Sequence, residues 1–270
     1  MEIMGRNYGS KGYSKEKIFR MCEEKDISQL YNLGVVNYLS TVKGDAELCN
    51  EVVAEWVLKN VQKFTEIIMF TRTNPYFVSG HNGKLTETKK NKPSNREEEI
   101  LAKKMYRRCY GPIGEITDYQ IPLKDYIKTN EDKHFGKIDL LSVNEYTKKI
   151  HLIELKKCGS NETMLRCILE GLTYYQILDK SKLKKDYAGK FRKDIKEGLR
   201  EDISYYEFVV SPLVFKDSQP YAEMMEMANG YRDNLQSLMD SLGNIIEPYY
   251  LDGKNENAVC RGFSEIWDYS

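Results

Sequence analysis

The chain has 270 residues, with 41% hydrophobic and 30% charged side chains and a formal net charge of zero. This length can bury a sizeable core, and the composition excludes the poorly hydrophobic, highly charged class of disordered proteins. No segment is apolar over the roughly 18 residues that a membrane span needs, and residues 1–25 lack the apolar core of a signal peptide, so we expect a cytoplasmic protein without a membrane partner.

Residues 1–90 are expected to form a largely helical N-terminal region. The segment 14–64 predicts two or three helices. In one of them Asp45 is a candidate N-cap, and apolar residues that include Trp56 recur at helical spacing behind it. We expect Trp56 to be a core residue rather than a platform for a ligand.

Two short strands are predicted next, at residues 67–70 and 76–78, separated by the turn-forming sequence TRTNP. Residues 79–95 are polar and rich in turn formers, which is typical of a linker or mobile loop. We therefore place a second domain at residues 91–270.

The second domain is predicted to begin with a helix in the sequence SNREEEILAKKMYRRC, which Ser94 or Asn95 can cap. Its first turn is acidic and its last turn is basic, as the helix dipole favours. The apolar residues expected to define its inward face are Ile100, Leu101 and Met105.

The elements that follow alternate between strands and helices. GKIDLLSV, residues 136–143, and KKIHLIELKK, residues 148–157, read as two strands joined by the turn NEYT. A helix is expected over about 162–179, then a buried strand over 204–215 that ends near Pro212, and a mostly helical remainder. This order implies an α/β fold with a central mixed β-sheet flanked by helices.

Three polar residues interrupt the two apolar strands. Glu154 and Lys156 are two apart, so they share one face of their strand, and a hairpin would place Asp139 of the preceding strand beside Glu154. Two adjacent carboxylates repel each other unless a cation lies between them. Oxygen ligands suit Mg²⁺, for which Mn²⁺ can substitute, whereas the scattered cysteines offer no zinc site.

Asp139, a gap of fourteen residues, and then Glu154-Leu155-Lys156 resemble the signature of the PD-(D/E)XK nuclease superfamily, which includes restriction endonucleases, Holliday-junction resolvases and RecB-type exonucleases. Ile138 stands where the proline of that signature would be. The resemblance covers residues 94–215. It implies a restriction endonuclease-like fold and Mg²⁺-dependent hydrolysis of phosphodiester bonds in nucleic acid. We expect DNA as the substrate, with RNA left open.

The resemblance also implies roles for individual residues. Family members are similar in having a helical Glu that faces the metal, and Glu97 is the best candidate because Ile100 and Leu101 follow it at i+3 and i+4, with Glu98 second. The implied metal ligands are Glu97, Asp139 and Glu154. Lys156 would orient or activate the attacking water and shield negative charge.

Substrate contacts are expected from a basic run. Residues 180–200 contain nine Lys or Arg against three Asp or Glu, so a basic face opposite the acidic segment 217–270 is compatible with DNA binding, although an ordinary solvated helix face is the alternative. RecB-like members are similar in carrying a Gln on the following helix, where this chain has Gln176, but Lys180 stands where they have Tyr. The residues expected to contact substrate are Gln176, Lys184, Lys185, Arg192 and Lys193.

Other readings stay open. His134 could reach a phosphate, whereas His151 lies on the strand face opposite Glu154 and is expected to be a satisfied core or edge residue. The chain could instead be a degenerate family member that binds nucleic acid without cutting it, or a protein whose acidic C-terminal segment binds another protein. Many relatives cut by pairing two subunits, so a homodimer is also left open.

Overall fold

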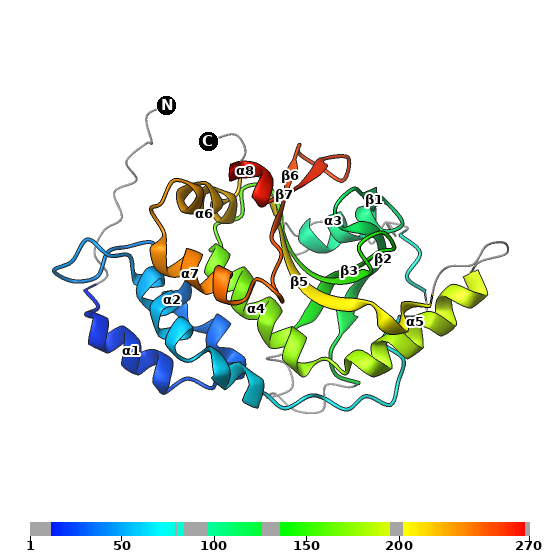
Figure 1. Cartoon of the computed structure of the whole chain (residues 1–270), viewed down its shortest axis with the longest axis horizontal. Coiled ribbons are helices and arrows are strands. Elements are labelled where there is room, and N and C mark those ends of the chain that lie inside the picture. Colours follow the sequence, from blue (N-terminus) through cyan, green and yellow to red (C-terminus); the bar gives the residue numbers. More distant parts are fainter. Residues whose placement is uncertain (1–11, 79, 84–96, 126–135, 195–201, 268–270) are drawn as a thin grey trace, which may run out of the picture.

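The chain folds around a mixed β-sheet in the structure, which is a computed structural model (Figure 1). It describes residues 12–78, 80–83, 97–125, 136–194 and 202–267. The seven strands of the sheet lie in the order in which they occur in the chain. They are β1 Cys109–Tyr110, β2 Gly114–Pro122, β3 Lys137–Asn144, β4 Lys149–Lys156, β5 Glu207–Phe215, β6 Tyr249–Asp252 and β7 Val259–Gly262.

The sheet is antiparallel from β1 to β4, parallel from β4 through β5 to β6, and antiparallel again at β7. The expected α/β class with a mixed sheet flanked by helices is therefore confirmed. The described α-helices are α1 Lys15–Glu23, α2 Cys49–Lys59, α3 Glu97–Met105, α4 Met164–Ile177, α5 Lys180–Asp194, α6 Gln219–Ala228, α7 Asp233–Ser241 and α8 Ser264–Trp267. Short segments of 3-10 helix occur at Ile27–Asn32, Gly34–Asn37, Val61–Glu66 and Ile203–Tyr205.

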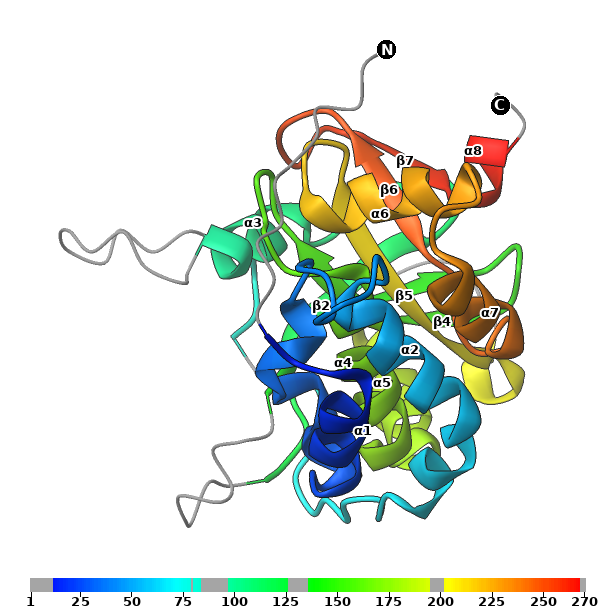
Figure 2. The ribbon, with the colours of Figure 1, turned by 90° about the vertical axis from the view of Figure 1, so that its left-hand side faces the viewer.

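The two faces of the sheet pack against different sets of helices. Ile150 and Leu152 of β4 point into a large core that they share with α4, α7 and the N-terminal helices α1 and α2. Ile153 and Leu155 point the other way, into a smaller core beneath α3. Figure 2 shows α1 and α2 on the α4 side of the molecule. Trp56 is buried in the large core, as predicted.

The predicted hairpin between β3 and β4 is present. The Asn144 side chain at its start accepts hydrogen bonds from the backbone N–H groups of Tyr146 (2.9 Å) and Thr147 (3.2 Å). Lys148 then adopts a positive φ of 59°, which completes the reversal. A side chain that bonds its own turn is a local signal, which is why the sequence reveals this hairpin.

Two predicted strands in the N-terminal region are wrong, since residues 67–70 and 76–78 follow an irregular path. The buried Arg72 explains this path, because its guanidinium donates to the carbonyl oxygens of Pro122 and Lys124 at 2.7 Å each. These bonds tie the segment to the end of β2 instead of leaving it free to pair. The candidate caps Ser94 and Asn95 lie outside the described residues.

Pro212 does not end its strand, contrary to the prediction, because β5 continues to Phe215. Val210, two residues earlier, makes both of its backbone bonds with residues 245 and 247 on the β6 side. Pro212 faces the same side by the alternation of a strand, but β6 pairs with β5 only from Leu213 onward. The missing N–H of Pro212 therefore falls in a gap between partners, where proline is tolerated.

The segment after β5 was predicted to be mostly helical, but it also supplies β6 and β7. A buried guanidinium joins this segment to the N-terminal region: Arg232, 2% exposed, lies 2.7 Å from Glu226, 3.5 Å from Glu223 and 3.6 Å from Glu51 of α2. Within the part of the chain that the structure describes, every helix is too short or too polar to cross a membrane.

Candidate metal centre

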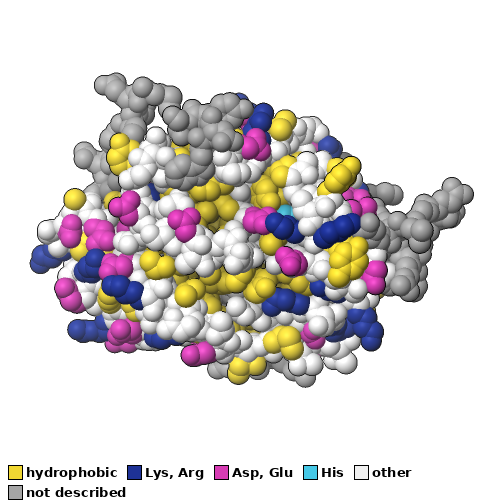
Figure 3. Space-filling model, in the orientation of Figure 1, with side chains coloured by type: hydrophobic (Ala, Val, Ile, Leu, Met, Phe, Trp, Pro, Cys, Tyr) yellow, Lys and Arg dark blue, Asp and Glu magenta, His cyan; other side chains and the backbone are white. Residues whose placement is uncertain are grey.

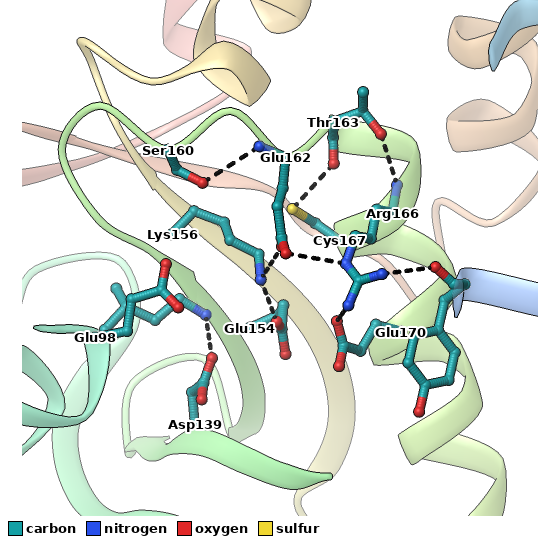
Figure 4. A network of polar contacts seen from close by, with 12 residues as sticks. Glu98, Asp139, Glu154, Lys156, Ser160, Glu162, Thr163, Arg166, Cys167 and Glu170 are labelled. Atoms are coloured by element: carbon teal, nitrogen blue, oxygen red, sulfur yellow. Dashed lines mark hydrogen bonds and ion pairs between the residues drawn. The ribbon is translucent and has the colours of Figure 1, made fainter. Parts of the chain in front are cut away.

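Asp139 and Glu154 lie side by side on the sheet. Leu140 pairs with Ile153 across β3 and β4, so the next residue along each strand, Asp139 and Glu154, faces the other. Directly opposite residues of an antiparallel pair share a face, with Cβ atoms about 4.5–5.5 Å apart. Both side chains point to the side covered by α4 (Figure 4). The predicted pairing of the two carboxylates is therefore present.

Lys156 lies between two carboxylates in the structure. Its Nζ is 2.6 Å from Glu154 and 2.5 Å from Glu162, which precedes α4. The Lys156 and Glu154 side chains are only 5% and 6% exposed. Burial by itself would lower the pKa of Lys156, but the surrounding acidic groups, led by Glu154, raise it well above its usual value. Lys156 therefore keeps its positive charge.

The Asp139 carboxylate is held at both oxygens. Oδ2 accepts the backbone N–H of Leu155 at 3.0 Å, and Oδ1 accepts the side-chain amide of Gln120 at 2.9 Å. Burial raises the pKa of Asp139 to about 7, and the carboxylates of Glu170 and Glu98 add to that rise, while Lys156 opposes it. This carboxyl group therefore lacks enough positive charge nearby.

Glu154 has the same deficit. Burial raises its pKa well above the usual value, and the nearby carboxylates of Glu170 and Asp139 raise it further. The ammonium of Lys156 only partly offsets these effects.

The charges of the cluster do not balance. If all five carboxyl groups of the cluster are ionised, they outnumber the cations near them, which are Lys156, Arg166 and the more exposed Lys157. The carboxylates are Glu98, Asp139, Glu154, Glu162 and Glu170 (Figure 4). A divalent cation bound through oxygen atoms would relieve this excess, so the donor set fits Mg²⁺ or Mn²⁺.

The cluster is not a ready-made cage. Among the described residues, no three His, Cys, Asp or Glu side chains are arranged as joint metal ligands. Mg²⁺ commonly takes only one or two protein carboxylates and completes its shell with water and substrate phosphate. Asp139 and Glu154 could supply such a pair once Glu154 is released from Lys156.

Of the two α3 glutamates considered as metal ligands, Glu98 rather than Glu97 acts on Asp139, and the metal role of either stays a prediction. Glu97 is 62% exposed and forms an ion pair with the side chain of Lys157. Glu98 accepts the backbone N–H of Lys157 at 3.3 Å and adds to the rise in the pKa of Asp139. The inward face of α3 carries Ala102 and Met105, at i+4 and i+7 from Glu98. Ile100, on which the choice of Glu97 depended, is 42% exposed.

We expect Glu98→Gln to weaken Mg²⁺ or Mn²⁺ affinity by about tenfold or more, because it removes negative charge beside Asp139. Calorimetric titration measures this directly. Glu97→Gln is the matched control and should leave the affinity unchanged, since an exposed ion pair with Lys157 contributes little. Equal losses in the two variants would show that α3 contributes only general charge.

Glu162 and Glu170 were not identified from the sequence. Glu162 pairs with Lys156 and with Arg166, while Glu170 lies 3.7 Å from Arg166 and accepts the hydroxyl of Tyr174 at 2.7 Å. Arg166 and Glu170, four residues apart, were visible as one polar face of the expected helix, and Glu162 lies four residues before Arg166. That the face turns toward β4 depends on the packing of α4.

The residues expected to contact substrate are not gathered at the cluster. Lys184 donates to the carbonyl oxygen of Ser204 at 2.8 Å and lies over the ring of Phe208. Phe208 pairs with Ile150, at the opposite end of β4 from Glu154. The structure thus does not place Lys184 beside the carboxylates.

The other basic residues named for this role also lie on α5. Lys185 is exposed, whereas the side chains of Arg192 and Lys193 lie outside the described residues. Gln176 is half-buried on α4, six residues and roughly 9 Å along the axis from Glu170. Charges of both signs alternate over the face in Figure 3, so that face carries no continuous basic surface.

Of the histidines, His134 lies outside the described residues. His151 is buried on the opposite face of β4, with Nδ1 2.9 Å from the Ser211 hydroxyl. Burial lowers its pKa to about 4, so it is neutral. Its predicted place in the core is confirmed, but only one ring nitrogen is satisfied, because the buried Nε2 has no hydrogen-bond partner among the described residues.

No protein-family model, no curated protein and no solved structure matches this chain. The assignment of a function therefore depends on the chemistry of the cluster.

Proposed function

We propose that this chain is a Mg²⁺-dependent nuclease of the PD-(D/E)XK kind that hydrolyses phosphodiester bonds, with DNA as its first substrate. The observation that carries the proposal is the buried pair of Asp139 and Glu154, which share one sheet face with Lys156 and have too little positive charge around them. The order of α3, β2, β3, β4, α4 and β5 around the pair supports a restriction endonuclease-like core.

Each residue has a role that follows from its surroundings. Asp139 and Glu154 would hold Mg²⁺, with Glu98 adding negative charge from α3. The ion, when bound, would polarise the scissile phosphate and lower the pKa of a bound water. Lys156 keeps its proton, so it serves as a cation that orients the water and shields the charge that develops on the phosphate. It is not a general base.

Glu162 would keep Lys156 in place during this exchange. If Glu154 were to bind the ion, the contact of 2.5 Å with Glu162 would still anchor the ammonium at the end of β4. Arg166 lies 3.2 Å from Glu162 and holds that carboxylate in turn. Glu162 is thus a second partner of Lys156 and is not one of the proposed ligands of the ion.

A second candidate is a family member that binds nucleic acid without cutting it. The ion pair between Lys156 and Glu154 favours this reading, because it occupies one of the proposed ligands. The nuclease would need a divalent ion that binds Glu154 in place of Lys156. The binding protein would not need such an ion.

The proposal is tested by incubating the protein with plasmid, single-stranded DNA, branched DNA and RNA, each with Mg²⁺, Mn²⁺ or EDTA. We expect DNA cleavage with either ion and none with EDTA. Binding without cleavage under all conditions would favour the second candidate, and cleavage that persists in EDTA would contradict a metal mechanism.

A further inference from the structure

Gln120 has a backbone conformation that its position in the sheet does not explain. It lies within β2, yet its φ is +49°. The other described non-glycine residues with positive φ, Arg107 and Lys148, lie in turns. Left-handed backbone is unfavourable for a residue with a Cβ atom, and within a strand it also disturbs the ladder. A shift in the pairing register between Ile116 and Asp118 lies just before it.

The side chain of Gln120 makes one contact that accounts for this placement. Tyr119 pairs with Leu140 and Ile121 with Ile138, so Gln120 lies opposite Asp139. Its amide Nε2 donates to Oδ1 of Asp139 at 2.9 Å. Asp139 itself lies opposite Glu154, which makes Gln120 the outer member of a row across three strands.

We propose that Gln120 is a positioning residue for the metal pair, and that the strained backbone is retained because it aims this amide at Asp139. The inference rests on the proposed function. Leu155 N–H fixes one oxygen of Asp139 and Gln120 fixes the other, which prevents the carboxylate from rotating. Each carboxylate oxygen has a second acceptor site, which remains for an ion or its water. Strain of this kind persists where surrounding structure and function require it.

Two substitutions of Gln120 separate the effect of its side-chain amide from the effect of its strained backbone. Gln120→Ala removes the amide and keeps the strain, whereas Gln120→Gly removes both, because glycine adopts positive φ readily. Both variants should bind Mg²⁺ or Mn²⁺ about tenfold to a hundredfold more weakly, as is typical when the partner of a metal ligand is lost. The Gly variant should be more stable than the Ala variant, with a higher Tm in EDTA, because it alone relieves the backbone strain.

Lys148→Gly is the matched control, because it changes a residue of similar φ in the β3–β4 turn, at the end of both strands away from Asp139 and Glu154. Its ion affinity should equal that of the wild type. Affinities are measured by calorimetry and Tm by thermal unfolding of the ion-free chain, so both readouts are independent of cleavage.

The outcomes are distinct. Wild-type affinity in Gln120→Ala would overturn the inference while leaving the proposed function standing. Recovery of affinity in Gln120→Gly would also overturn it, because the backbone rather than the amide would then matter. A wild-type chain that neither binds the ion nor cleaves DNA would overturn the proposed function, and the inference with it.

Discussion

Lys156→Ala is expected to lower DNA cleavage by about a hundredfold or more, since it removes a cation needed as charge develops on the phosphate. The ion should still bind to this variant, because the variant lacks the ammonium group that pairs with Glu154 in the wild type. Glu154→Ala should instead lose both ion binding and cleavage. A metal titration run beside a cleavage assay on the two variants measures this difference.

Lys157→Ala is the control for this experiment. Lys157 is the next residue in the chain, but its side chain is 40% exposed and pairs with Glu97 outside the cluster. Its replacement should leave cleavage near the wild-type rate. Circular dichroism should confirm that each variant is folded, because Lys156 is buried between two carboxylates. Full activity in folded Lys156→Ala would refute the role given to this residue.

Arg232→Met is expected to lower the free energy of unfolding by about 3–5 kcal/mol, because it leaves buried carboxylates without their cation. Burial already raises the pKa of Glu223 to about 7 although Arg232 opposes that rise. Arg232 also donates to the side-chain oxygen of Asn50 at 3.0 Å, so its loss weakens the contact between the C-terminal segment and α2. Urea unfolding measures the cost.

Lys216→Met removes a cation from an exposed pair with Asp252 and is the comparison for Arg232→Met. Exposed pairs typically contribute about 0–1 kcal/mol, so this variant should unfold near the wild-type urea concentration. If Arg232→Met lowered the free energy of unfolding no more than Lys216→Met, the buried ion pairs of Arg232 would not be what joins the C-terminal segment to α2.

The pairing of Asp139 with Glu154 could be predicted because it depends on local rules. Strand residues alternate between faces, and the turn at Asn144 carries its own hydrogen-bonding side chain. Together these fix which residues of β3 and β4 meet. The helix α4 was equally predictable, since Thr163 caps it and its apolar residues recur at helical spacing.

The remainder of the site depends on contacts between distant segments. Glu98 was ranked below Glu97 because Ile100 looked like a core residue, and only the packing of α3 shows that it is exposed. Gln120 was missed because its strand, β2, was not predicted, and because a positive φ inside a strand leaves no mark in the sequence. The strands β6 and β7 were missed because each has only four residues, too few for a clear alternating pattern.

The proposed function depends first of all on the binding of a divalent ion by Asp139 and Glu154 together. Calorimetric titration of the wild type, Asp139→Asn and Glu154→Gln with Mg²⁺ and Mn²⁺ tests it most directly, because both substitutions keep side-chain size and remove one charge. We predict saturable binding in the wild type and a large loss of affinity in each variant. Absence of binding in the folded wild type, or affinity that neither substitution changes, would contradict the account.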